Sequence, residues 1–189
     1  MTVEAHDFHR RATEWFDSNV DRVSDHHWTA STPCTEWDVR ELVRHLVYEQ
    51  LWIPPLLEGQ TIEQVGDRFE GDILGGDPKG AWRDATKGAL AAVGEDGVMD
   101  RTVHLSYGDR RGSEYVNEVA TDLLIHGWDL ARAIGADEAM DAELVRHVYE
   151  QTEPHTAGLK ASGLFGPEVT PPEGADRQTE LLAIFGRVA

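Results

Sequence analysis

The chain has 189 residues, enough for one domain with a buried core, and 40% of them are hydrophobic. It carries 35 acidic residues against 17 Lys and Arg, which gives a formal net charge of −18. This deficit of cations argues against a nucleic-acid binder and disfavours attachment to an anionic membrane, because both need a basic surface.

Apolar residues at helical spacing predict a first helix over residues 5–22. Thr35 is predicted to begin a second helix, because Asp38 follows three residues later as in a capping box. This helix carries an apolar stripe from Val39 to Val47 and is predicted to end at Pro54–Pro55. Residues 52–77 then form a long connection with a short helix over 61–69.

A third helix is predicted to begin at Asp77 and Pro78 and to stop at Gly94. Residues 102–112 alternate weakly and favour a small hairpin. Ser113 is predicted to cap a fourth helix over 114–134, which is apolar on most sides and should therefore be central. A shorter helix follows from Asp141, then a tail rich in Pro and Gly over 154–174, and a last helix over 177–185.

Four amphipathic helices with one long connection between the second and the third predict an all-α four-helix bundle with a crossover and a short C-terminal helical extension. We expect a single domain over 1–189, with its core at about 4–152 and a tail over 153–189. The acidic residues are expected to form a solubilising surface, for example at Glu63, Asp67, Glu70, Asp72, Glu95 and Asp96.

Cys34 is the only cysteine, which excludes an intramolecular disulfide. It lies at a predicted helix start, where a thiolate would be favoured, but no base adjoins it, and a small buried apolar residue is the simpler interpretation. No apolar run is long enough to span a membrane, and the first residues are polar. We therefore predict a cytoplasmic protein.

Nine histidines are the candidates for chemistry, and two of them differ from the rest in context. Asp122 and His126 are four residues apart on the fourth helix, so they share one face and can bind one divalent metal ion. If the second helix packs beside the fourth, His45 supplies a third ligand and leaves a position open on zinc or another first-row ion. The alternative is that Asp122, His126 and Asp129 form the solvated face of their helix. The remaining histidines, among them His6 and His9, are interpreted as solvated or structural.

Two segments resemble a known family. The string from Ser31 to Val47 resembles the N-terminal signature of the mycothiol-dependent maleylpyruvate isomerase group, and the string from Asp122 to Ala133 resembles its metal-helix signature. Both belong to the DinB/YfiT-like superfamily of metal-binding four-helix bundles. The strings 163–172 and 181–187 resemble the tail of an actinobacterial subgroup.

The resemblance implies that His45, Asp122 and His126 are metal ligands, with zinc as the expected metal and nickel, manganese or iron as alternatives. Asp122 stands where the isomerase is expected to have Glu. Too few residues follow His126 for the separate C-terminal domain of the isomerase, so maleylpyruvate isomerisation itself is not expected.

The resemblance also implies mycothiol as a co-substrate, whose thiolate would attack a small electrophile in a transfer or an isomerisation. The catalytic residues are unknown: Glu49 is the nearest candidate for a general base, but a solvated carboxylate or a support for the ligands is the simpler interpretation. Two alternatives stay open, a non-catalytic homodimer that binds a metal or a small molecule, and a metal-dependent hydrolase.

Overall fold

The structure is a computed structural model, and it describes residues 3–156 and 169–189. It is mostly helical and divides into two compact units, one over residues 4–137 and one formed by Val3 and the chain from residue 138 onward. The expectation of one domain over 1–189 concerns how these units associate, and it stays a prediction.

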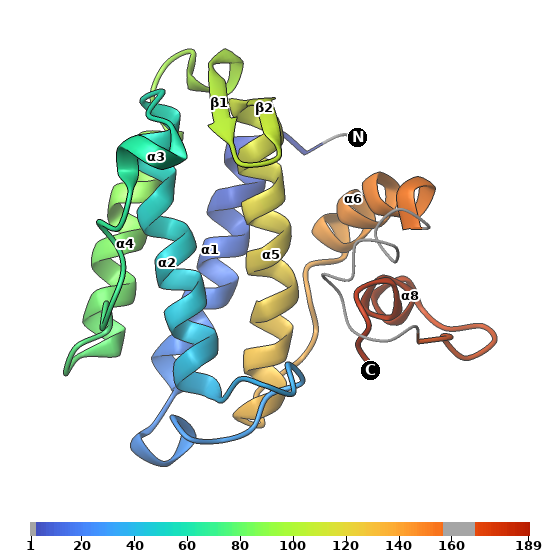
Figure 1. The fold of residues 1–189 in the computed structure, drawn as a ribbon. Helices are drawn as coiled ribbons and strands as arrows, with labels where there is room; N and C mark the ends of the chain where they lie inside the picture. The colour runs from blue at the N-terminus through green and yellow to red at the C-terminus, as the bar shows by residue number, and fades with distance from the viewer. Residues whose placement is uncertain (1–2, 157–168) are drawn as a thin grey trace. The chain divides into compact units, whose positions relative to one another are not determined.

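The unit over residues 4–137 is built from four long helices (Figure 1). They are α1 (Ala5–Arg22), α2 (Val39–Leu57), α4 (Pro78–Val93) and α5 (Gly112–Ala133). The closest pairings are α1 with α5 and α2 with α4, while α2 also contacts α5 and α1 contacts α4. The apolar spacing therefore predicted the right number of long helices in this unit, and α5 is the helix with the most buried residues.

The boundaries of α2 differ from the prediction at both ends. Asp38, not Thr35, is the N-cap: its side chain accepts a hydrogen bond from the backbone N–H of Glu41, whose carboxylate accepts one from Asp38 in return. Pro54 and Pro55 do not end the helix, which continues to Leu57. Each proline lacks an N–H donor, but the carbonyls of Pro54 and Pro55 still accept hydrogen bonds from the backbone N–H groups of Glu58 and Gln60.

The long connection after α2 runs back along that helix before α4 begins, so α2 and α4 run in the same direction (Figure 1). Its short helix α3 (Ile62–Val65) is capped by Thr61 and stops at Gly66, earlier than the predicted residue 69. Arg44 and Arg40, one turn apart on α2, donate hydrogen bonds to the carbonyls of Gly71 and Gly75. These two bonds attach the returning segment to the helix.

A two-stranded antiparallel hairpin joins α4 to α5, as predicted. It consists of β1 (Thr102–Leu105) and β2 (Gly108–Arg111), with Thr102 opposite Arg111. The helix α5 begins at Gly112 and not after Ser113, and its N-cap is Arg111, whose backbone N–H donates to the Glu114 carboxylate. Gly112 packs closely against the carbonyl of Val98. A side chain at position 112 would collide with that backbone.

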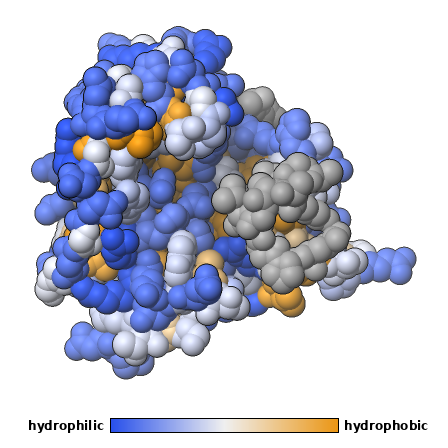
Figure 2. Space-filling model, viewed as in Figure 1, coloured by the Kyte–Doolittle hydropathy of each residue, from blue (hydrophilic) through white to orange (hydrophobic). Residues whose placement is uncertain are grey.

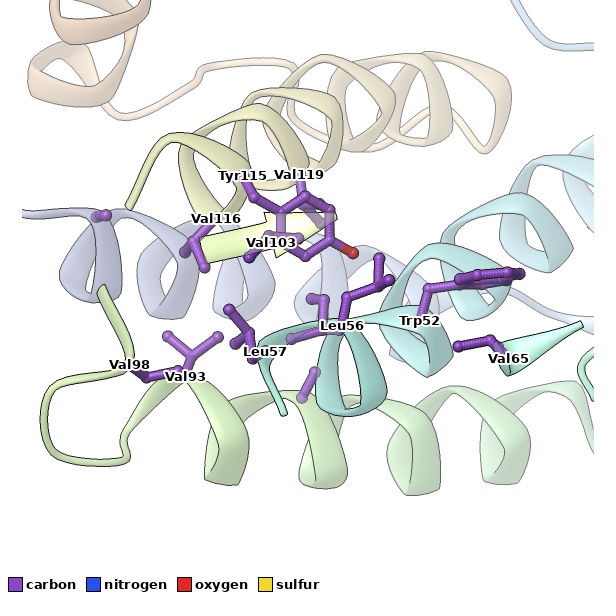
Figure 3. Packing of buried hydrophobic residues seen from close by; sticks show 13 residues of the cluster. Trp52, Leu56, Leu57, Val65, Val93, Val98, Val103, Tyr115, Val116 and Val119 are labelled. Carbon is purple, nitrogen blue, oxygen red and sulfur yellow. The ribbon is translucent and has the colours of Figure 1, made fainter. Parts of the chain in front are cut away.

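A core cluster fills the space between α2, α4, α5 and β1 (Figure 3). Its labelled members include Trp52, Leu56 and Leu57 of α2, with Val103, Tyr115 and Val116 facing them. Outside, hydrophilic residues dominate the surface drawn in Figure 2, and hydrophobic residues appear only in small groups. The six acidic residues named above for a solubilising surface are all exposed, as expected.

The second unit contains α6 (Ala142–Thr152), capped by Asp141 as predicted, and α8 (Arg177–Ile184), capped by Asp176. Gln178 of α8 accepts a hydrogen bond from the backbone of Met140 and donates one to the carbonyl of Glu138. Most of the predicted Pro- and Gly-rich tail lies outside the described residues. None of the described helices combines the length and the apolar character that a membrane span requires.

Candidate metal centre

Three side chains predicted as ligands converge between α2 and α5. His45 Nε2 lies 2.8 Å from Asp122 Oδ2, and His126 Nε2 lies 3.4 Å from Asp122 Oδ1. The carboxylate thus presents one oxygen to each imidazole, and the ligand atoms of the three residues all lie within 4.8 Å of one another. The condition set by the sequence, that α2 must pack beside α5, is met. Although Asp is one methylene shorter than Glu, Asp122 still reaches His45 on the other helix.

The three side chains are unequally exposed. The side chain of His126 is 8% exposed, whereas those of His45 and Asp122 are 27% and 36% exposed. Burial by itself raises the pKa of Asp122, but His126 and His45 together hold it well below its usual range. For His126, burial by itself lowers the pKa of the imidazole. The Asp122 carboxylate and hydrogen bonds to Asp129 and Cys34 outweigh burial and raise this pKa well above its usual range.

A pocket of about 550 Å³ opens beside His45. It is lined by aromatic rings and by side chains of both charges: Trp37, Glu41, Arg44, His45, Tyr48 and Glu70. The ring centroid of Trp37 lies 4.7 Å from that of His45 and 5.6 Å from that of His126. Because His45 belongs both to the convergent cluster and to this pocket, a small molecule in the pocket would reach the cluster on its exposed side.

Glu49, one turn after His45 on α2, is the carboxylate predicted as a candidate general base. Burial raises the pKa of Glu49 and the Asp122 carboxylate acts in the same direction, while His45 and His126 act in the opposite direction. The geometry gives Glu49 no defined catalytic task, and the general base stays unassigned.

A second set of contacts surrounds the other nitrogen of His126. Asp129 Oδ2 lies 2.9 Å from His126 Nδ1 and accepts a hydrogen bond from Cys34 Sγ–H at 3.3 Å. Cys34 Sγ is 3.7 Å from the same ring nitrogen. The sequence analysis missed this arrangement, although a His and an Asp three residues apart on a helix are a recognisable signal of contact. The side chain of Asp129 is 0% exposed, so a solvated face formed by Asp122, His126 and Asp129 is wrong for its last two members.

One other histidine differs from its interpretation, and a second is buried in agreement with a structural role. His9, expected to be solvated, is fully buried and hydrogen-bonded to Gln50. His147 is buried as well, in the second unit. Neither belongs to a group that could hold a metal among the described residues.

The residues present fit a divalent metal. Two imidazoles and one carboxylate are a donor set that zinc and other first-row ions accept, and three protein ligands leave a coordination position open. The fit rests on the observed convergence of the two Nε2 atoms on a single carboxylate. That these residues act as ligands stays a prediction.

One family model and two relatives match this chain. The family model described as the mycothiol maleylpyruvate isomerase N-terminal domain matches residues 9–131, well over half of the chain. Two proteins of Mycobacterium tuberculosis, from two strains and both described only as uncharacterized, are 30% identical over 141 residues, which cover 72% of this chain and 70% of theirs. No solved structure matches significantly. The region matched by the family model includes most of α1, all of α2 and α4, and nearly all of α5, and so all three predicted ligands.

Proposed function

The chain belongs to the mycothiol maleylpyruvate isomerase N-terminal domain family, and on that premise we propose that it is a metal-dependent enzyme that joins a low-molecular-weight thiol to a small electrophile. The observation that carries the proposal is the convergence of His45 and His126 on Asp122 at the edge of a pocket. The family's name points to mycothiol as the thiol, and in this proposal the scaffold is a metal-binding four-helix bundle of DinB type. The pairing of α1 with α5 and of α2 with α4, with a crossover between α2 and α4, supports that scaffold.

In this proposal His45, Asp122 and His126 hold the metal, which is expected to be zinc. When bound, the metal would stabilise the thiolate form of the co-substrate at neutral pH. His45 lines the pocket and belongs to the cluster, so the thiol sulfur and the electrophile would meet beside it. His126, nearly buried, would anchor the site.

The chain's other residues would bind and orient the substrates. Trp37 and Tyr48 offer aromatic faces to the carbon body of a substrate, and the Arg44 guanidinium can donate hydrogen bonds to its oxygens. In the reaction the thiol sulfur forms a bond to an electrophilic carbon, and the thiol's proton ends on the adduct. If the adduct keeps the thiol, the reaction is a transfer, and if it expels the thiol, the reaction is an isomerisation.

The first test is metal analysis of protein purified without chelators. Wild type should hold close to one metal ion per chain, and His126→Ala should hold much less, because it loses a buried ligand. The matched control is His104→Ala, which removes an imidazole paired with a carboxylate, Asp109, at the same 2.8 Å distance that separates His45 and Asp122. That pair is exposed on the hairpin, so His104→Ala should retain the metal. Equal and negligible metal in all three proteins would overturn the proposal.

The second test assigns the reaction class. Metal-loaded wild type would be incubated with mycothiol and a general electrophile, and loss of the free thiol would be followed over time. Thiol-dependent turnover that is absent in His126→Ala supports the transferase or isomerase. Two alternatives predict other outcomes: a metal-dependent hydrolase would turn over esters or amides without thiol, and a non-catalytic homodimer would turn over neither substrate.

A further inference from the structure

Asp129 is a fully buried carboxylate that lies beside the candidate metal centre without belonging to the predicted ligand set. Burying a carboxylate costs several kcal/mol unless hydrogen bonds and a counter-charge offset the loss of hydration. Its Oδ2 atom accepts from two donors, His126 Nδ1–H at 2.9 Å and Cys34 Sγ–H at 3.3 Å. The two nitrogens of His126 are thus divided between two carboxylates, Nε2 facing Asp122 and Nδ1 facing Asp129.

We propose that Asp129 is a positioning residue for the metal centre: it fixes the ring of His126 so that the lone pair of Nε2 is presented to the metal, and Cys34 supports it as a hydrogen-bond donor. The inference rests on the proposed function. A neutral imidazole carries its proton on one nitrogen only, and the hydrogen bond made by that nitrogen decides which one remains free to bind a metal. A carboxylate that accepts from Nδ1–H therefore keeps Nε2 available.

The loop before α2 gives Cys34 a fixed place in this arrangement. The backbone N–H of Cys34 donates to the Thr32 hydroxyl, and its carbonyl accepts from the backbone N–H of Trp37. The Thr32 hydroxyl also lies 2.8 Å from the carbonyl of Trp37. One turn therefore brings Cys34 to the Nδ1 side of His126 and Trp37 to within 5.6 Å of the same ring. Both residues are therefore held by one hydrogen-bonded turn that precedes α2.

A different role for the same atoms is a metal site formed by Cys34, His126 and Asp129, whose ligand atoms also lie within 4.8 Å of one another. Such a site would engage Nδ1 of His126 and turn the thiol into a ligand. We favour the hydrogen-bonded role, because Asp129 is fully buried, whereas His45 lines the pocket and the side chain of Asp122 is 36% exposed. Cobalt distinguishes the two roles, since thiolate bound to Co²⁺ gives an intense charge-transfer absorption that imidazole and carboxylate ligands do not give.

The experiment measures the zinc affinity of the full chain by competition with a chromophoric chelator. Asp129→Asn is expected to weaken zinc binding by about 10- to 100-fold, as for other residues that orient a metal-bound histidine. Cys34→Ala should weaken it by less than about tenfold, and Cys34→Ser, which keeps a donor, should stay close to wild type. The matched control is Asp109→Asn, which removes a carboxylate from a histidine that is not near the centre and should leave the affinity unchanged.

Thermal unfolding of the metal-free variants separates positioning from stability, because a purely structural role would lower the melting temperature without changing the zinc affinity. Unchanged affinity in Asp129→Asn, or a thiolate charge-transfer band in the Co²⁺ form of wild type, would overturn the inference and leave the proposed function standing. If wild type binds no zinc, the proposed function itself fails. Should Asp129→Asn not fold, the comparison of Cys34→Ala with Cys34→Ser decides, and equal affinities in those two variants would overturn the role of Cys34.

Discussion

His9 makes the stability of the protein depend on pH in a way that can be calculated from the structure. Its ring is fully buried between α1 and α2, and Nε2–H donates to Gln50 Oε1 at 3.0 Å, while Nδ1 has no hydrogen-bond partner among the described residues. Burial lowers the pKa of His9 to about 4, and the hydrogen bond to Gln50 acts in the opposite direction. In the unfolded chain the same imidazole has a pKa near 6.5.

The sign of the effect follows from these two values. Between about pH 6.5 and pH 4 the unfolded state binds a proton at His9 that the folded state does not, so the free energy of unfolding falls as the pH falls. Below the pKa that His9 has in the folded state, both states are protonated at this residue, and the free energy of unfolding stops falling. A difference of about 2.5 pKa units corresponds to about 3 kcal/mol in full, of which about 2 kcal/mol is lost by about pH 5.

The assay is urea unfolding between about pH 7.5 and pH 5, in the presence of a chelator, for wild type and His9→Gln. Over this range the free energy of unfolding of wild type should fall by about 2 kcal/mol more than that of the variant, because glutamine does not titrate. His6→Gln, on the exposed side of the same helix, is the control and should keep the wild-type profile. Parallel profiles for wild type and His9→Gln, with equal dependence on urea, would refute the reasoning.

Two further predictions concern the fold and the metal. Gly112→Ala should lower the free energy of unfolding by about 1–3 kcal/mol, because the new Cβ would collide with the Val98 carbonyl, and urea unfolding checks this; a loss below about 0.5 kcal/mol would contradict it. Zinc at about 100 times its Kd should stabilise wild type by about 3 kcal/mol and raise its melting temperature relative to protein in chelator; an equal rise in His126→Ala would place the zinc elsewhere.

The helices of the protein could be predicted to the extent that local signals define them. The start of α4 at Asp77 and Pro78 and that of α6 at Asp141 were correct, because each combines a capping side chain with a following apolar stripe. The start of α2 was misplaced because Thr35 and Asp38 are both good N-cap residues, and only the reciprocal bonds between Asp38 and Glu41 decide between them. The rule that a proline ends a helix failed at Pro54, where the carbonyl still accepts a hydrogen bond from the backbone N–H of Glu58.

The candidate site could be predicted only in part, for a different reason. The spacing of Asp122 and His126 is local and predicts that the two residues share a face. That His45 faces them depends on which helices pack together, and no spacing within α2 contains that information. The burial of Asp129 and its hydrogen bond to Cys34 depend in the same way on contacts between residues 95 positions apart. Non-local packing therefore decided the rest of the site.

The placement of the three predicted ligands on α2 and α5 has a consequence for the order of events during folding. His45 and Asp122 are separated by 77 positions in the chain, so the candidate centre exists only after a long loop has closed, at an entropic cost on the order of 4 kcal/mol. The chain between His45 and Asp122 includes α3, α4 and the hairpin, and these elements must be in place when the loop closes. We therefore expect metal loading to follow the collapse of the helical core and to serve as a kinetic probe for the docking of α5 onto α2.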